Sequence, residues 1–256
     1  MKVTILGCGG AAGVPGISAG WGACDATNPK NRRRRSAILV EEGATTILVD
    51  TPPDLRDQLL DAQVRRLDAV IYTHDHADHL HGIDDLREIN RVTRDWLPVW
   101  GNAQTLATAT LRFSYAFEPV DDIGKMVYRP LLKPCEITGP FSVGGIDVVP
   151  FDQDHGFCRT LGLRFGKIAY STDVVELPEA SFDALAGVDL WIIGCLVDSP
   201  HATHAHVDKA LDWIERIKPK RAVITHMGSR LDYQTLVARL PENVIPAHDG
   251  LVLEVP

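Results

Sequence analysis

The densest group of chemically versatile side chains in this sequence lies in residues 72–82, which read YTHDHADHLHG. Four histidines and two aspartates fall within positions 74–81, directly after the apolar run AVIYT. Imidazole suits zinc, manganese and iron, and a carboxylate adds the negative charge that holds a second cation. A solvated polar loop is the competing interpretation, and so many metal-binding side chains after one strand make it the weaker one. The segment therefore predicts a metal site.

The spacing of these residues favours a loop over a helix. His74 and His76 are two positions apart, and Asp78 and His79 follow at once. On a helix, side chains at these offsets would spread around the axis. On a tight loop that leaves a buried strand they can converge on a common point, so we expect a loop here.

The elements that would position this loop are strands mixed with helices. Apolar runs bounded by turn residues predict strands at 3–6, 37–41, 46–50, 69–73, 146–151, 161–165, 167–172, 189–194, 222–226 and 251–255. Helical spacing and start signals predict helices at 54–62, 84–91, 103–113, 206–217 and 231–239. An early pair of strands forms a hairpin around Glu42-Gly43. This pattern predicts an α+β fold of four αββα layers, with residues 1–256 forming one domain.

The composition is typical of a soluble globular protein and predicts a cytoplasmic location. The longest apolar runs are far shorter than a membrane-spanning helix requires, and VTIL after Met1-Lys2 is too short for a secretory signal. Five scattered cysteines form no CxxC pair, which favours a reduced compartment. The net charge of −8 argues against general nucleic-acid binding. We therefore expect a cytoplasmic protein that binds neither a membrane nor, stably, a nucleic acid.

A glycine-rich stretch near the N-terminus imitates a dinucleotide-binding loop. GCGGAAG at 7–13 follows an expected strand, as that fingerprint requires. The residues after it, VPGISAGWG, contain proline and further glycines where the fingerprint needs a helix. We therefore expect a glycine-rich turn here, whose backbone amides could still approach a ligand.

The HxHxDH pattern, complete at 74–79, resembles the signature of the metallo-β-lactamase superfamily. The resemblance implies the four-layer fold and a dinuclear centre. It implies that one ion is held by His74, His76 and His155, that the other is held by Asp78, His79 and His226, and that Asp173 bridges both. His155, Asp173 and His226 lie in DQDHGF, AYSTDV and VITHMG, and each of these segments follows an expected strand.

Such a pair of ions makes hydrolysis the expected chemistry. Ions ~3.5–4 Å apart trap a water between them and lower its pKa from ~15.7 toward ~7, so that a bridging hydroxide is available at neutral pH. The ions also clamp the oxygens of a phosphoryl or acyl group. The redox relatives of this superfamily carry glutamate at the second histidine position. Here that residue is His76, which favours hydrolysis.

A narrower resemblance, covering nearly the whole chain, is to PhnP-like phosphodiesterases. It is carried by HADHLHGIDDLR (76–87), SPHATHAHVDKAL (199–211), THMG (225–228) and AHDGL (247–251), among other segments. The resemblance implies that His204 acts at the leaving group, which fits the need of a departing alkoxide for a proton. His204 and Asp78 are the expected catalytic residues. His201 and His206 are expected to belong to an exposed polar loop.

The cofactors implied are two divalent metal ions. The subgroup resemblance favours Mn²⁺, and the ligand types also accept Zn²⁺ or Fe²⁺. PhnP has an additional structural zinc, held by cysteines in the loop after the first strand and by a histidine three residues past the last ligand. In this sequence Cys24 is the only cysteine of that loop, and Ser229 replaces the histidine. We expect the structural zinc to be absent and the loop to hold by packing, through Trp21.

Three residues are expected to support the centre or to contact the substrate. Asp50, at the end of an expected strand, is a candidate hydrogen-bond partner for a metal-bound histidine. His81 is a second candidate, which could instead begin the following helix. Within the run of four arginines at 32–35, Arg35 is a candidate for a phosphate contact. A phosphate contact suits the entry of this run into a strand, where alternation would turn Arg34 or Arg35 inward. A solvated face is the more ordinary interpretation of such a run.

The function that these observations predict is hydrolysis of small, cyclic phosphodiesters, such as cyclic nucleotides or cyclic ribose phosphates. A tRNA 3′-processing endoribonuclease is the first alternative, although the chain lacks a basic Gly/Pro-rich arm. A glyoxalase II-like thioesterase is the second, although its C-terminal helices are not evident. A metal-binding sensor without activity is a third. The expected partner is a small phosphodiester or nucleotide, and a homodimer is left open.

Overall fold

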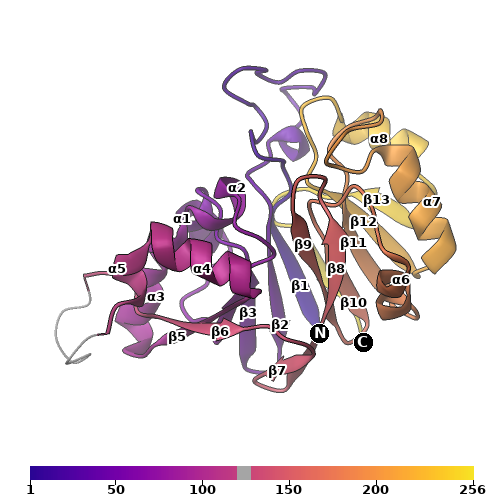
Figure 1. The fold of residues 1–256 in the computed structure, drawn as a ribbon. Coiled ribbons are helices and arrows are strands. Elements are labelled where there is room, and N and C mark those ends of the chain that lie inside the picture. Colours follow the sequence, from indigo (N-terminus) through magenta and orange to yellow (C-terminus); the bar gives the residue numbers. More distant parts are fainter. Residues whose placement is uncertain (120–127) are drawn as a thin grey trace.

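A computed structural model describes residues 1–119 and 128–256 of the chain (Figure 1). Within them, two seven-stranded sheets pack face to face. The first sheet has the order β14-β1-β2-β3-β4-β5-β6. Its strands are β1 (Lys2–Gly7), β2 (Ala37–Glu42), β3 (Thr45–Val49), β4 (Ala69–Ile71), β5 (Leu97–Gly101), β6 (Leu132–Glu136) and β14 (Val252–Glu254). Strands β3 to β6 run parallel, and the others pair antiparallel.

The second sheet has the order β13-β12-β11-β10-β9-β8-β7. Its strands are β7 (Phe141–Val143), β8 (Ile146–Asp154), β9 (Arg159–Phe165), β10 (Ile168–Ser171), β11 (Leu190–Gly194), β12 (Arg221–Thr225) and β13 (Val244–Pro246). Strands β10 to β13 run parallel, so their carboxyl ends lie along one edge of the sheet.

Helices cover the outer face of each sheet (Figure 1). Over the first sheet lie α1 (Leu55–Asp61), α2 (Ala77–Leu80), α3 (Leu86–Thr93), α4 (Ala103–Arg112) and α5 (Ser114–Phe117). Over the second lie α6 (Glu179–Leu185), α7 (Val207–Ile217) and α8 (Tyr233–Arg239). Short 3-10 turns occur at Pro29–Asn31 and Ile83–Asp85. None of the helices in the described ranges is both long and apolar enough to span a membrane.

The layers follow from apolar residues on both faces of the strands. In β2, Ile38 and Val40 pack in the core between the sheets, while Leu39 packs against the outer helices. In β3, Ile47 likewise packs between the sheets and Leu48 packs against the outer helices. Successive side chains of a strand point to opposite faces, so a strand buried on both sides must be apolar throughout. The predicted α+β sandwich of four αββα layers is confirmed.

The ten predicted strands and five predicted helices are all present, with ends shifted by a few residues. Four strands were missed, namely β5, β6, β7 and β13. Three of these lie at sheet edges. Proline occurs in the edge strands β6 and β13 and also in the interior strand β5. Proline is tolerated at an edge because its missing N–H faces no partner strand. The proline and the short length of these strands hid them from pattern analysis.

Candidate metal centre

The candidate ligands leave the carboxyl ends of strands in both sheets. His74 follows β4, His155 follows β8, Asp173 follows β10 and His226 follows β12. Asp78 and His79 lie in the short helix α2, which begins after His76. The expectation that a tight loop would carry all of these residues was therefore wrong for Asp78 and His79. One helical turn places the neighbouring side chains of Asp78 and His79 toward the same centre while the loop before it carries the two histidines.

The structure brings all seven predicted ligands into two groups that share Asp173. One group consists of His74, His76, His155 and Asp173, and the other of Asp78, His79, Asp173 and His226. Within each group the ligand-type atoms lie within 4.8 Å of one another. The division matches the one implied by the resemblance, including Asp173 in both groups.

Asp173 is the centre of this arrangement. Its Oδ1 lies 3.1 Å from Nε2 of His79 and 3.1 Å from Nε2 of His226. Its Oδ2 lies 3.5 Å from Nε2 of His155 and 3.9 Å from Nε2 of His74. One carboxylate oxygen therefore faces each group of histidines, as a bridging ligand requires.

Buried nitrogen atoms without hydrogen-bond partners mark the centre as a ligand site. Nε2 of His74, His79 and His226 are buried, and among the described residues none has a hydrogen-bond partner. Native proteins satisfy most buried polar atoms, so an orphaned cluster needs an explanation. Imidazole nitrogens and carboxylates are the donors that zinc, manganese and iron accept. The residues present fit two divalent cations.

Asp50 supports both groups from behind. Its Oδ2 accepts a hydrogen bond from Nδ1 of His79 at 2.7 Å and another from the hydroxyl of Thr73 at 2.8 Å. The Thr73 hydroxyl lies 3.0 Å from Nδ1 of His74. Nδ1 of His155 donates to the backbone carbonyl of Thr203 at 2.7 Å. Such contacts fix the ring and leave Nε2 for the metal. The prediction for Asp50 agrees with this geometry, whereas the two threonines were missed because a threonine directly before a histidine is no signal by itself.

Three residues of the centre have left-handed backbone conformations. The φ angle is +65° at Asp50, +46° at Asp173 and +55° at His226. Residues with a Cβ adopt this region at a cost of about 1–3 kcal/mol, and such residues concentrate at functional sites. At these positions the turn after a strand aims the side chain at the centre, and the surrounding structure holds it there.

The electrostatics of the centre favour a cation. Burial lowers the pKa of His79, but the carboxylates of Asp173, Asp78 and Asp50 outweigh it and hold that pKa well above its usual value. Burial raises the pKa of Asp173, but His226 and His79 hold it well below the usual value. The negative charge that favours a proton on His79 favours a metal cation equally.

His204 lies beside the centre, close to one of the bridging oxygens. Its Nε2 is 3.3 Å from Oδ2 of Asp173, and its Nδ1 is 2.8 Å from the hydroxyl of Thr203. Burial is the largest cause of a lowered pKa for His204. His201 is exposed and hydrogen-bonds to Thr203, and His206 precedes α7 without a side-chain capping bond. Of the three histidines in this loop, His204 alone borders the ligand groups, as expected.

The other sequence candidates lie away from the ligand atoms. His81 is exposed and packs its ring against Phe113 at 5.5 Å between centroids, so it contributes no hydrogen bond to a ligand in the described structure. Arg35 forms an ion pair with Asp54 at 3.0 Å instead of facing the centre. The expected roles of His81 and Arg35 therefore find no support in the geometry. Asp75 takes part through its carbonyl, which accepts a bond from Arg112.

The arginine run is not a solvated face. Arg33 is buried, whereas Arg32 is exposed and stacks on the ring of Trp21. Arg34 bonds Asp249, and Arg35 bonds Asp54. The inward residue is therefore Arg33 and not Arg34 or Arg35. Strand alternation failed as a guide because this segment enters β2 through a loop, where side chains do not alternate.

The glycine-rich stretch forms a turn, as expected. The N–H of Gly13 donates to the carbonyl of Gly10 at 2.8 Å. A Cβ on Gly10 would lie 2.6 Å from Cδ1 of Leu196 and 3.4 Å from Cε1 of His226. A Cβ here would displace the end of the Leu196 side chain and would touch the His226 ring, so the turn packs closely against this candidate ligand. The sequence showed the turn but not its contact with His226.

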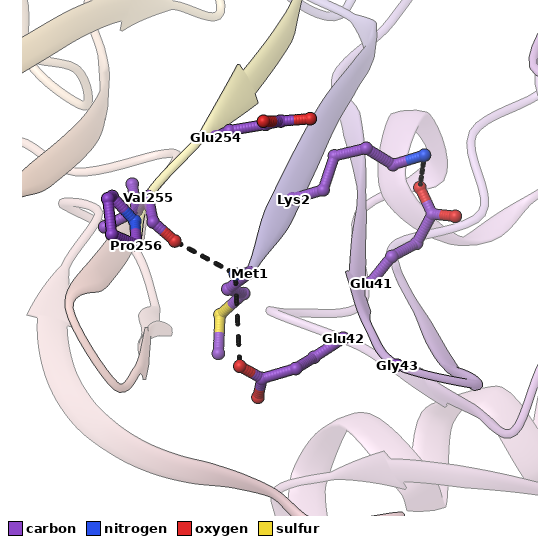
Figure 2. Close-up of a pocket in the computed structure, with 8 residues that line it drawn as sticks. All are labelled: Met1, Lys2, Glu41, Glu42, Gly43, Glu254, Val255 and Pro256. Atoms are coloured by element: carbon purple, nitrogen blue, oxygen red, sulfur yellow. Dashed lines mark hydrogen bonds and ion pairs between the residues drawn. The ribbon is translucent and has the colours of Figure 1, made fainter.

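A cavity of about 490 Å³ lies at the opposite end of the sandwich, where the two termini meet (Figure 2). It is lined by Met1, Lys2, Glu41, Glu42, Gly43, Glu254, Val255 and Pro256. Lys2 pairs with Glu41 at 2.7 Å, and the terminal amine donates to the carbonyl of Val255. This cavity contains no histidine or cysteine, so the chemistry belongs to the centre around Asp173.

The family model of the beta-lactamase superfamily domain matches residues 45–227, which contain every candidate ligand. This chain belongs to the beta-lactamase superfamily. A crystal structure described as a new diphosphatase from the PhnP family superposes with a TM-score of 0.91 and 31% identity, covering 100% of this chain and 98% of that one. The chain therefore belongs to the PhnP family within that superfamily.

More distant members share the fold. Zinc-bound PqqB from Methylobacterium extorquens superposes with a TM-score of 0.77 and 19% identity, over 100% of both chains. Human tRNase Z, short form, superposes with a TM-score of 0.72 and 17% identity, again over 100% of both chains.

Two curated relatives match in sequence. An octanoyltransferase from Porphyromonas gingivalis is 31% identical over 256 residues, which are 98% of this chain and 51% of that protein. A ribonuclease Z from Bradyrhizobium sp. is 38% identical over 85 residues, which are 32% of this chain and 28% of that protein. This member of the superfamily thus spans about half the length of the first relative.

Proposed function

We propose that this protein is a metal-dependent hydrolase, a phosphodiesterase that cleaves small, cyclic phosphodiesters, such as cyclic nucleotides or cyclic ribose phosphates. The single observation that carries the proposal is His204. Its Nε2 lies 3.3 Å from Asp173 yet belongs to neither ligand group. A histidine that borders the reacting centre without holding a metal is free to carry a proton.

Two divalent ions fit the ligand groups, and the proposal favours Mn²⁺, with Zn²⁺ or Fe²⁺ as alternatives. When bound, such ions lower the pKa of a water from ~15.7 toward ~7 and neutralise charge on a phosphoryl group. His74, His76 and His155 would hold one ion. Asp78, His79 and His226 would hold the other, and Asp173 would bridge both.

His204 would supply the proton that the leaving alkoxide needs. In hydrolysis a hydroxide derived from water forms a new P–O bond while the P–O bond to the leaving group breaks. The electron pair of the broken bond stays on the leaving oxygen, and the proton on Nε2 of His204 passes to it. The Thr203 hydroxyl fixes the ring from the Nδ1 side at 2.8 Å. Because burial lowers the pKa of His204, a protonated ring there is a stronger acid than one in water.

Three other substrates remain as outcomes of the test. The PhnP-family neighbour is described as a diphosphatase, so a phosphoanhydride is one. The ribonuclease Z relative makes a tRNA precursor the second, although a net charge of −8 opposes a large polyanion. A thioester is the third. The octanoyltransferase name describes a protein about twice as long as the part matched here.

A substrate panel tests the proposal. The purified protein is stripped with a chelator, reloaded with Mn²⁺ or Zn²⁺, and assayed for kcat/KM. The panel contains a 2′,3′-cyclic nucleotide, a cyclic ribose phosphate, a linear dialkyl phosphate, a dinucleoside diphosphate, a precursor tRNA and a glutathione thioester. We expect the cyclic diesters to exceed every other class by about tenfold or more, which is ~1.4 kcal/mol in the transition state. A preference for the diphosphate, the tRNA or the thioester would reject the proposal.

A further inference from the structure

A buried arginine lies behind the metal centre, outside both ligand groups. The Arg33 side chain is 2% exposed, although its neighbour Arg32 and the nearby Lys30 are both exposed. Buried cations are rare in proteins unless they are paired or fully hydrogen-bonded. The contacts of its guanidinium group therefore indicate what it is kept there to do.

The guanidinium joins two loops that are far apart in the sequence. Nη2 donates to the carbonyl of Leu231 at 2.7 Å, and Nη1 donates to the carbonyl of Gly228 at 3.1 Å. On its own side, Nη2 also donates to Oδ1 of Asn31 at 3.2 Å, and Nη1 lies 3.9 Å from the sulfur of Cys24. We call this set, Arg33 with Cys24, Asn31 and the carbonyls of Gly228 and Leu231, the Arg33 clamp.

The loop that the clamp holds begins at a metal ligand. His226 is followed by Met227, whose N–H donates to the carbonyl of Cys8, and by Gly228, whose N–H donates to the carbonyl of Leu196. His226 has a φ of +55°, a conformation that an L-residue holds only when its surroundings impose it. The two backbone bonds fix one side of the loop, and Arg33 fixes the carbonyls on its other side.

Further hydrogen bonds join the same two loops next to the Arg33 clamp. The side chain of Asn31 donates to Asp232 at 2.7 Å, and its Oδ1 accepts the N–H of Tyr233 at 2.8 Å. The thiol of Cys24 lies 3.5 Å from the carbonyl of Ser229. Cys24 and Ser229 are thus neighbours, and the Arg33 guanidinium lies beside them.

We propose that Arg33 is a positioning residue for the dinuclear centre, acting as an organic cross-link that holds the loop after His226 and so keeps this ligand in its strained, metal-binding geometry. A planar guanidinium has donors in a fixed fork and suits two carbonyls from one loop. Lysine offers a flexible point charge in place of that fork. The inference rests on His226 being a metal ligand and is independent of the substrate.

The test measures metal binding directly. Metal-free wild-type protein and the variants Arg33→Lys and Arg33→Met are titrated with Co²⁺, followed by visible absorption and calorimetry. Arg32→Lys and Arg32→Met are the matched controls, because Arg32 is the exposed neighbour. The same substitutions are also made together with His76→Ala, which removes a donor from the group of His74, His76 and His155. In that protein the tighter binding event reports on the other group, which contains Asp78, His79 and His226.

We expect both Arg33 variants to bind the ion of the His226 group about ten- to a hundredfold more weakly, the range seen when a ligand loses its supporting contact. The ion of the other group should keep its wild-type affinity, and both Arg32 variants should match the wild type. Wild-type affinity for both ions in folded Arg33→Lys and Arg33→Met would overturn the proposal. Equal weakening of both ions, or failure of both variants to fold with metal present, would also overturn it by making Arg33 a general structural residue.

Because neither titration uses turnover, this result is separate from the fate of the phosphodiesterase proposal. A protein that prefers thioesters could still show the selective loss, and a phosphodiesterase could still lack it.

Discussion

The ligand groups around Asp173 and the Arg33 clamp are two buried polar clusters that meet at the same loop. In the ligand groups, Nε2 of His74, His79 and His226 lack partners among the described residues. In the clamp, both terminal nitrogens of Arg33 donate to carbonyls, and only its Nε is unpaired. Both clusters contain buried polar atoms, but they satisfy these atoms in opposite ways.

The contrast separates a site that needs a ligand from a cross-link that is complete. A buried donor or acceptor without a partner costs about 1–3 kcal/mol, so several pointing at one place imply a bound group. In the guanidinium of Arg33, both terminal nitrogens already donate to backbone carbonyls. We therefore assign cation binding to the first cluster and loop positioning to the second. Three substitutions would break or sharpen this distinction, in order of decreasing effect.

The largest effect is expected at Asp173. Asp173→Asn keeps the shape of the side chain but removes the charge that both ligand groups share, so we expect loss of both ions and of all metal-dependent turnover. Bound metal is measured by elemental analysis after gel filtration. Asp147→Asn, on the exposed face of β8, is the control and should retain two ions. Retention of two ions by Asp173→Asn would remove the bridging role.

The next effect is expected at His204. With both ions bound, His204→Ala should lower kcat about 10²- to 10⁴-fold for a diester with an alkoxide leaving group. The loss should be much smaller for a 4-nitrophenyl ester, whose leaving group needs no proton. His201→Ala, in the same loop, is the control. An equal loss for both leaving groups would exclude proton donation by His204.

The smallest effect is expected beside the clamp, at Asp232. Partial burial raises the pKa of this carboxyl, but hydrogen bonds from the N–H groups of Thr235 and Asp25 and from Asn31 outweigh it and lower the pKa to about 2. Because the pKa of this carboxyl is lower in the folded state, the carboxylate stabilises the fold at pH values above its ordinary pKa of 3.8. That stability is lost as the pH falls toward 2. The carboxyl is largely solvated, so screening keeps the contribution small.

Urea unfolding of the metal-free protein measures this effect. Asp232→Asn should be about 1 kcal/mol less stable than the wild type at pH 7, and the difference should shrink between pH 4 and pH 2. Asp147→Asn should show no such trend. A constant difference across this range would mean that Asp232 acts through shape and not through charge.

Much of the centre was accessible from the sequence because its signals are local. HxHxDH packs four ligands into six residues after one strand, and His155, Asp173 and His226 each follow an apolar run. The carboxyl ends of neighbouring parallel strands share an edge, so residues just beyond them can meet. The same logic found Asp50 at the end of β3. The structure pairs His81 with Phe113 and Arg35 with Asp54, and the sequence positions of His81 and Arg35 do not indicate the direction in which their loops turn.

The sequence alone determined the type of fold, the chemistry of the donors and their order along the chain, because apolar runs and ligand types are properties of single segments. Only the tertiary structure decided which polar groups meet. It buried Arg33 and exposed Arg32, placed Thr73 between His74 and Asp50, and brought Gly10 against His226. The physical reason is that these contacts join segments up to about two hundred residues apart through carbonyls and close approaches, which every residue type offers and no sequence pattern marks.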